Sequence, residues 1–102
     1  MLDERIRNEQ IDELAEAMLV LENRDEAYLF FEDLFTIKEL QAVAQRLSVA
    51  RLLKKRVTYQ EIAEKTGAST ATISRVNRSL SYGAGGYQMV LARMPRDEAK
   101  RD

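Results

Sequence analysis

The stretch YQEIAEKTGASTATISRVNRS, residues 59–79, has the spacing of two short helices joined by a tight turn. Ala63 stands where two such helices would cross and where only a small side chain fits. Gly67 follows four residues later and suits a left-handed turn position, which costs other residues energy. Apolar side chains recur at the offsets that would lock the second helix onto the first: Ile62, Ile73 and Val76. The pattern predicts a helix-turn-helix.

Capping residues mark the start of both helices. Thr58 and Glu61 form a capping box, which predicts a short helix from there to about Lys65. Ser69 or Thr70 can cap the second helix, which should run to about residue 81. The helix-turn-helix segment is therefore expected to span residues 58–81.

The second helix carries small, hydroxyl and arginine side chains on the face opposite its apolar residues. Such side chains suit the major groove of DNA, because they bond base edges and phosphates or touch a thymine methyl group. The alternative is an ordinary polar surface helix. The expected contacts to double-stranded DNA are Tyr59, Gln60, Ser69, Thr70, Ala71, Thr72, Ser74, Arg75 and Arg78.

The rest of the chain also predicts helices and no strands, so the expected fold class is all-α. Apolar residues recur at helical spacing before residue 22, Asn23 can cap a second helix, and Thr36 with Glu39 forms another capping box. The expected helices outside the motif span about residues 3–22, 25–35, 36–55 and 87–94.

The segment DEAYLFFEDLF, residues 25–35, is apolar around almost its whole circumference. A helix of this kind has to be buried on nearly every side. A chain of 102 residues can hardly surround it alone. We therefore expect a homodimer that is formed through the first two helices.

These features predict a single helical DNA-binding domain over residues 1–95. Its expected parts are dimerisation helices at 1–35, a core helix at 36–56, the helix-turn-helix at 58–81 and a C-terminal segment at 83–95. Residues 96–102, with nothing to bury, predict a disordered tail.

Charge is divided unevenly along the chain, although the formal net charge is −1. Residues 1–39 hold four basic and twelve acidic side chains, whereas residues 40–102 hold twelve basic and five acidic ones. A basic half can attract a polyanion because salt keeps the field local. Two solvated helix faces would give the same division of charge.

The composition excludes several kinds of site. The chain has no histidine and no cysteine, so disulfides, the usual zinc ligands and the usual nucleophile–base pairs are missing. Gly83, Gly85 and Gly86 follow a helix and not a strand, which argues against a nucleotide-binding loop. We expect neither an enzyme nor a metal site. No apolar run approaches the roughly 20 residues of a membrane span, and the N-terminus lacks a signal peptide, so a cytoplasmic protein is expected.

The sequence GASTATISR at residues 67–75, followed by NRSL at 77–80, resembles the Trp repressor superfamily and in particular its YerC/YecD-like branch of helix-turn-helix regulators. The likeness runs from about Leu34 to Leu80, and the helix that contains Gln45-Arg46-Leu47 resembles the family's central core helix. The resemblance implies a Trp-repressor-like, intertwined all-helical dimer whose two helix-turn-helix units enter successive major grooves.

The resemblance also implies a place for a small-molecule effector. Thr36, Arg46, Arg75 and Ser79 occupy the positions that surround the indole ring in the family's tryptophan-binding repressor. Val76, however, stands where that repressor has glycine, and its branched side chain would crowd a flat ring. This argues against L-tryptophan and leaves another effector, or none. Phosphate contact or ion pairing is the alternative role of the two arginines.

The sequence thus predicts a sequence-specific transcriptional regulator, a repressor that binds a palindromic operator as a homodimer. The half-sites should lie about 34 Å apart, one turn of the duplex. The alternative is an interaction adaptor that uses the helix-turn-helix to contact the transcription machinery and has no operator of its own.

Overall fold

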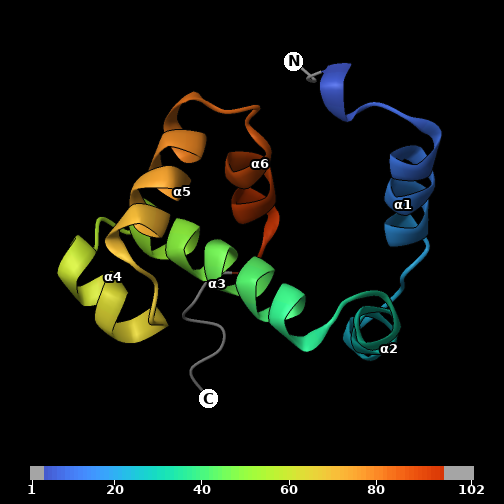
Figure 1. Cartoon of the computed structure of the whole chain (residues 1–102), viewed down its shortest axis with the longest axis horizontal. Helices are drawn as coiled ribbons and strands as arrows, with labels where there is room; N and C mark the ends of the chain where they lie inside the picture. The colour runs from blue at the N-terminus through green and yellow to red at the C-terminus, as the bar shows by residue number, and fades with distance from the viewer. Residues whose placement is uncertain (1–3, 96–102) are drawn as a thin grey trace. The chain divides into compact units, whose positions relative to one another are not determined.

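The computed structural model describes residues 4–95, and the predicted disordered tail at 96–102 lies outside the described residues. Every regular element between residues 4 and 95 is helical, which confirms the all-α fold class (Figure 1). A 3-10 helix at Glu4–Ile6 is followed by α1 Glu9–Leu19, α2 Arg24–Leu34, α3 Ile37–Lys54, α4 Tyr59–Thr66, α5 Thr70–Tyr82 and α6 Gly86–Arg93. The chain divides into two compact units, of which the first ends at Gln41 and the second begins at Ala42.

The start of α1 differs from the prediction. One helix over residues 3–22 is wrong, because the Glu4–Ile6 turn is separate and α1 begins only at Glu9. The cause is local: the side chain of Asn8 accepts a hydrogen bond from the backbone N–H of Ile11 at 2.8 Å. This N-cap competes with continuation of the helix through residue 8.

The start of α2 follows the prediction that Asn23 caps it. Asn23 Oδ1 accepts from the N–H of Glu26 at 2.9 Å, and Glu26 Oε1 accepts from the N–H of Glu22 at the same distance. The glutamate three residues after the cap therefore returns to the chain just before it, which fixes the entry into α2.

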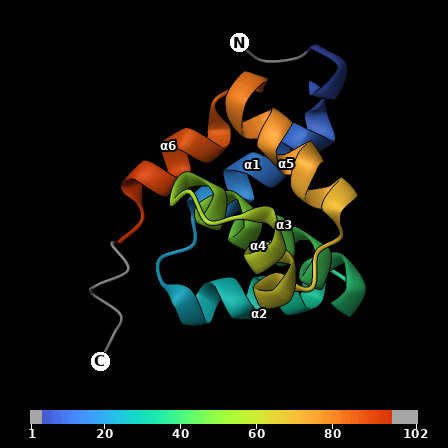
Figure 2. The same cartoon turned by 90° about the vertical axis from the view of Figure 1, so that its left-hand side faces the viewer.

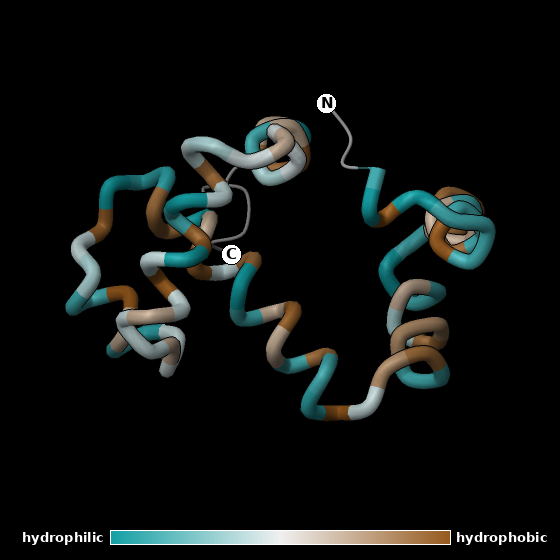
Figure 3. The backbone as a smooth tube through the Cα atoms, turned by 45° about the horizontal axis from the view of Figure 1, so that its top comes forward, coloured by the Kyte–Doolittle hydropathy of each residue, from teal (hydrophilic) through white to brown (hydrophobic). Residues whose placement is uncertain are grey.

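The helices of the first unit bury little. No residue of α1 or α2 is buried, and large apolar side chains lie open, among them Leu19 at 82% and Leu29 at 67% exposure. Apolar and polar stretches alternate along these helices in Figure 3. Phe31 and Phe35 meet edge to face, with ring centroids 5.9 Å apart. In a single chain the described part of the first unit, residues 4–41, therefore has no core of its own.

The beginning of α3 is fixed by the predicted capping box. Thr36 Oγ1 accepts from the N–H of Glu39 at 3.1 Å, and Glu39 Oε1 accepts from the N–H of Thr36 at 2.9 Å. Both halves of the box are present, so α3 starts at Ile37 as a well-capped helix.

The second unit contains the core. α5 contacts both α4 and α6. Figure 2 shows these helices from the side on which α4 faces the viewer. The side chains of Tyr87 and Leu91, from α6, pack against this core from outside. Its buried members come from α3, α4, the turn and α5: Val49, Ala50, Ile62, Ala68, Ile73 and Val76. The core thus holds the predicted helix-turn-helix to the C-terminal half of α3.

Candidate nucleic-acid interface

The turn between α4 and α5 has the predicted geometry. Gly67 caps α4 with a left-handed φ of 76°, and its N–H donates to the carbonyl oxygen of Ala63 at 2.9 Å. Ala63 is half-buried and packs against the core, as expected of the residue at the helix crossing. The helix-turn-helix prediction is confirmed in its local structure.

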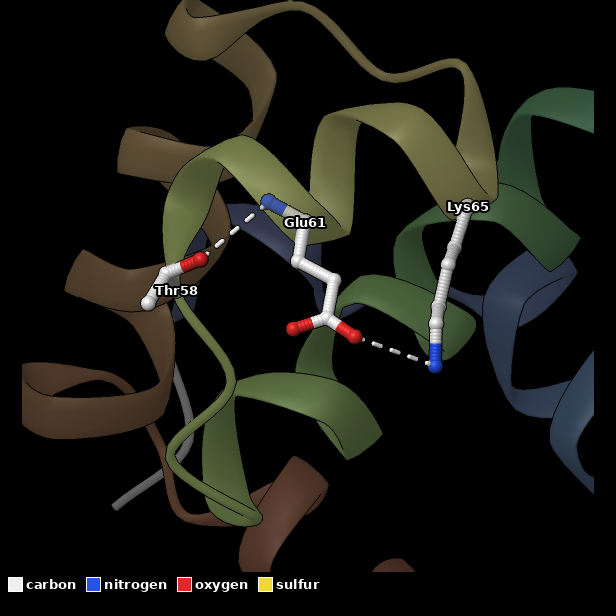
Figure 4. A network of polar contacts seen from close by, with 3 residues as sticks. All are labelled: Thr58, Glu61 and Lys65. Carbon is white, nitrogen blue, oxygen red and sulfur yellow. Dashed lines mark hydrogen bonds and ion pairs between the residues drawn. The ribbon is translucent and has the colours of Figure 1, made fainter.

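The start of α4 forms only half of the predicted capping box. Thr58 Oγ1 accepts from the N–H of Glu61 at 3.2 Å, but the carboxylate of Glu61 pairs with Lys65 Nζ at 3.5 Å (Figure 4). Both side chains are more than half exposed, so this ion pair contributes little stability. Tyr59 and Gln60, two of the predicted DNA contacts, form the exposed first turn of α4.

Ser69, and not Thr70, caps α5. Its Oγ accepts from the N–H of Thr72 and donates to Thr72 Oγ1, each at 3.1 Å. Thr72 is half-buried and its hydroxyl already has this partner, whereas Thr70 is exposed. Ser69 and Thr72 therefore shape the start of the helix in addition to any contact that they make with DNA.

The two faces of α5 are sharply different. Ile73 and Val76 are buried, which confirms that they hold the helix to the core. The opposite face is exposed throughout and consists of Thr70, Ala71, Ser74, Arg75 and Arg78. The structure thus gathers seven of the nine predicted contacts on α5 and its cap, and places the other two at the start of α4.

The exposed face of α5 is also free of negative charge. The helix contains no acidic residue, and within residues 4–95 neither Arg75 nor Arg78 forms an ion pair with a carboxylate. The described part of the second unit, residues 42–95, holds nine basic and two acidic side chains. Arg75 and Arg78 are therefore available for phosphate oxygens, and contacts of this kind are the main source of affinity for a duplex.

The four predicted effector residues have separate environments. Thr36 lies in the first unit, where its hydroxyl caps α3. Arg46 on α3 and Arg75 and Ser79 on α5 are exposed, and in the described part of the chain no hydrogen bond or ion pair joins their side chains. Val76, directly after Arg75, is 2% exposed and belongs to the core. The effector site therefore remains a prediction.

Two residues behind the turn were missed by the sequence reasoning. Gln45 Nε2 donates a hydrogen bond to the carbonyl oxygen of Thr66 at 3.1 Å, and the hydroxyl of Thr66 donates to the carbonyl oxygen of Ile62 at 2.7 Å. A signal was present, because Gln45 stands one helical turn before the buried Val49 and is thus a polar residue on the core side of α3.

Other kinds of site find no support in the described residues. No group of three or more carboxylates there could hold a metal ion. None of the helices between residues 4 and 95 is long and apolar enough to cross a membrane.

The chain resembles several known proteins along nearly its whole length. Residues 9–95 match the family described as Trp repressor protein. The uncharacterized protein YerC of Bacillus subtilis (strain 168) is 47% identical over 97 residues, which cover 95% of this chain and 93% of YerC. A crystal structure of a candidate Trp repressor from Staphylococcus aureus has a TM-score of 0.86 at 52% identity, covering 92% of this chain and 94% of that one. A TrpR-like protein from Eubacterium eligens ATCC 27750 has a TM-score of 0.84 at 48% identity, covering 92% and 100%.

Proposed function

Because this chain belongs to the Trp repressor family, we propose that it is a sequence-specific DNA-binding transcriptional regulator that represses genes as a homodimer in the cytoplasm. One observation carries the proposal. α5 buries Ile73 and Val76 and leaves an exposed, acid-free face that carries Ser74, Arg75 and Arg78. Membership of a family of repressors also favours a regulator over an enzyme.

In the proposed complex the N-terminal turns of α5 enter the major groove. Thr70, Ala71 and Ser74 are short enough to let the helix backbone approach the base edges, and Arg75 can fork onto guanine or a phosphate. The start of α4, with Tyr59 and Gln60, meets the phosphate backbone, as the first helix of such motifs does. Arg78 and the basic end of α3 add attraction to phosphates that carries no sequence information.

The homodimer is proposed from the exposure of the first unit. α1 and α2 carry apolar side chains but bury no residue in the single chain, so a partner surface has to cover them. A second copy supplies such a surface through two-fold symmetry, which places two α5 helices on one duplex. We expect residues 1–95 to behave as one domain in this dimer, and the operator to be palindromic, with half-sites about 34 Å apart.

Any effector is proposed to be a molecule other than L-tryptophan. Arg46, Arg75 and Ser79 are exposed in the second unit and could take a polar ligand. Val76 fills the core directly beside Arg75, and its branched side chain leaves less room for a flat ring than the glycine of the tryptophan-binding repressor.

The proposal is tested by selecting duplexes from a randomised pool with the full-length protein and then measuring affinity against a scrambled competitor. The expected result is a palindromic consensus that is bound at least about a thousand-fold more tightly than the scrambled duplex. Binding that ignores sequence would reject the regulator and favour the adaptor, which needs no operator.

A further inference from the structure

We propose that Gln45 is a positioning residue for DNA recognition, because its side-chain amide ties the turn before α5 to α3 and so sets how α5 is presented to the groove. This inference rests on the proposed function and adds a determinant of specificity that never touches DNA. Gln45 lies on α3, 21 positions before its partner Thr66 at the end of α4.

The hydrogen bond satisfies a carbonyl group that the helix itself leaves open. Thr66 is the last residue of α4, and the final carbonyl groups of a helix have no partner within it. Gln45 Nε2 supplies the missing donor at 3.1 Å in a half-buried place. A half-buried carbonyl oxygen without this donor would lose a hydrogen bond that water replaces only incompletely.

The rest of the turn is also closed by directional bonds. The hydroxyl of Thr66 donates to the carbonyl oxygen of Ile62 at 2.7 Å and accepts from the N–H of Ala68 at 3.1 Å. A Cβ placed on Gly67 would lie 3.9 Å from Gln45 Nε2, so the amide of Gln45 also lies against the turn glycine. Gln45 therefore joins α3 to a turn whose internal geometry is already fixed.

The turn leads directly into the residues that are proposed to read DNA. Ala68 is buried in the core, and Ser69 after it caps α5. Apolar packing holds these helices together but has no preferred direction, whereas a hydrogen bond fixes both distance and angle. Base contacts need their side chains placed within about 0.5 Å, while attraction to phosphates tolerates larger shifts. Loss of the Gln45 bond should therefore reduce specificity more than general affinity.

The test compares Gln45→Met, which keeps the length of the side chain and removes the donor, with Gln41→Met at the exposed glutamine one turn earlier on α3. Affinities are measured for a duplex selected by the wild-type protein and for a scrambled duplex. Gln45→Met should lower affinity for the selected duplex about ten-fold and change that for the scrambled duplex less than about two-fold. Gln41→Met should change neither.

A second readout uses no DNA. Amide hydrogen exchange at Gly67 and Ala68 should accelerate in Gln45→Met, while Val49 and Ile73 in the core stay protected. Gln45→Glu, which keeps the shape but replaces the donor by an acceptor, should have the same effects if Gln45→Met fails to fold.

Three results would overturn the positioning role. The first is a Gln45→Met protein with wild-type preference for the selected duplex. The second is an equal loss of affinity for both duplexes, together with faster exchange at Val49 and Ile73, since this indicates a general loss of stability. The third is a wild-type protein that selects no duplex at all. That result rejects the proposed function, and with it this role in DNA recognition. Amide exchange at Gly67 separates this failure from the other two, because it reports on the Gln45 hydrogen bond even when no duplex is selected.

Discussion

The backbone N–H of Val57 donates to the carbonyl oxygen of Leu52 at 3.1 Å and closes the C-terminus of α3. Between them, the N–H of Arg56 donates to the carbonyl oxygen of Leu53 at 2.9 Å, and Arg56 has a left-handed φ of 65°. This pair of bonds is a Schellman motif, whose left-handed position usually holds glycine. Leu52 and Val57 are both apolar, as is usual at these two positions of the motif, and both pack against the core.

Arg56→Gly should therefore stabilise the protein. An L-amino acid in the left-handed region costs about 1 kcal/mol, and glycine removes most of this strain. Arg56→Ala is the matched control, because it removes the same charge and keeps the strain. Thermal unfolding should give a higher Tm for the glycine variant than for the alanine variant, and equal Tm values would show that the strain is absent.

Gly67→Ala should have the opposite effect. The φ of 76° disfavours any residue with a Cβ, although the nearest atom to that Cβ would be 3.9 Å away and no clash arises. We expect a loss of about 1 kcal/mol in the free energy of unfolding, measured by urea denaturation. Gly86→Ala, in the first turn of α6 with open space around it, should be neutral or slightly stabilising. A neutral Gly67→Ala would contradict the left-handed turn.

The local elements of the fold could be predicted from the sequence because their signals lie close together in the chain. The caps at Asn23 and Thr36 and the turn at Gly67 each depend on residues within four positions. The predicted start of α1 near residue 3 was wrong because Asn8 acts as an N-cap and interrupts an otherwise periodic segment. The Gln45–Thr66 hydrogen bond was missed because it joins distant residues: the helical spacing to Val49 places Gln45 on the core side of α3 but does not identify its partner.

The candidate site was predictable to a similar extent. Helical periodicity alone places Ile73 and Val76 on one face of α5 and Ser74 and Arg75 on the other, and the structure buries the first pair and exposes the second. Which base each side chain meets depends on the duplex and is not encoded in the helix. The choice between Ser69 and Thr70 as the cap was left open by the sequence, since both have a suitable hydroxyl, and the structure selects Ser69.

A charged residue on α2 should dissociate the proposed dimer. Leu29 is 67% exposed in the single chain, so Leu29→Lys should hardly affect the chain by itself. In a homodimer that covers α2, the same change would bury an unpaired charge. Sedimentation equilibrium should show a dimer for the wild-type protein and a shift toward monomer for the variant. An unchanged association constant would place the dimer interface elsewhere.

Added L-tryptophan should leave DNA affinity unchanged. Val76 is 2% exposed and belongs to the core, so its branched side chain cannot readily move to make room for a flat ring. Titration of the selected duplex with and without millimolar L-tryptophan checks this, and calorimetry without DNA should detect no binding heat. An increase in affinity of about ten-fold or more would mean that the helix moves to admit the ring.

The central claim is that the exposed face of α5 reads DNA sequence, and paired charge-neutralising variants test it most directly. Arg75→Ala with Arg78→Ala removes two cations from this face, while Lys65→Ala with Arg93→Ala removes two from α4 and α6. Affinity is measured for the selected and the scrambled duplex at several salt concentrations. The α5 pair should lose at least about ten-fold in preference for the selected duplex, whereas the control pair should keep that preference. Equal preference in both double variants would contradict the claim.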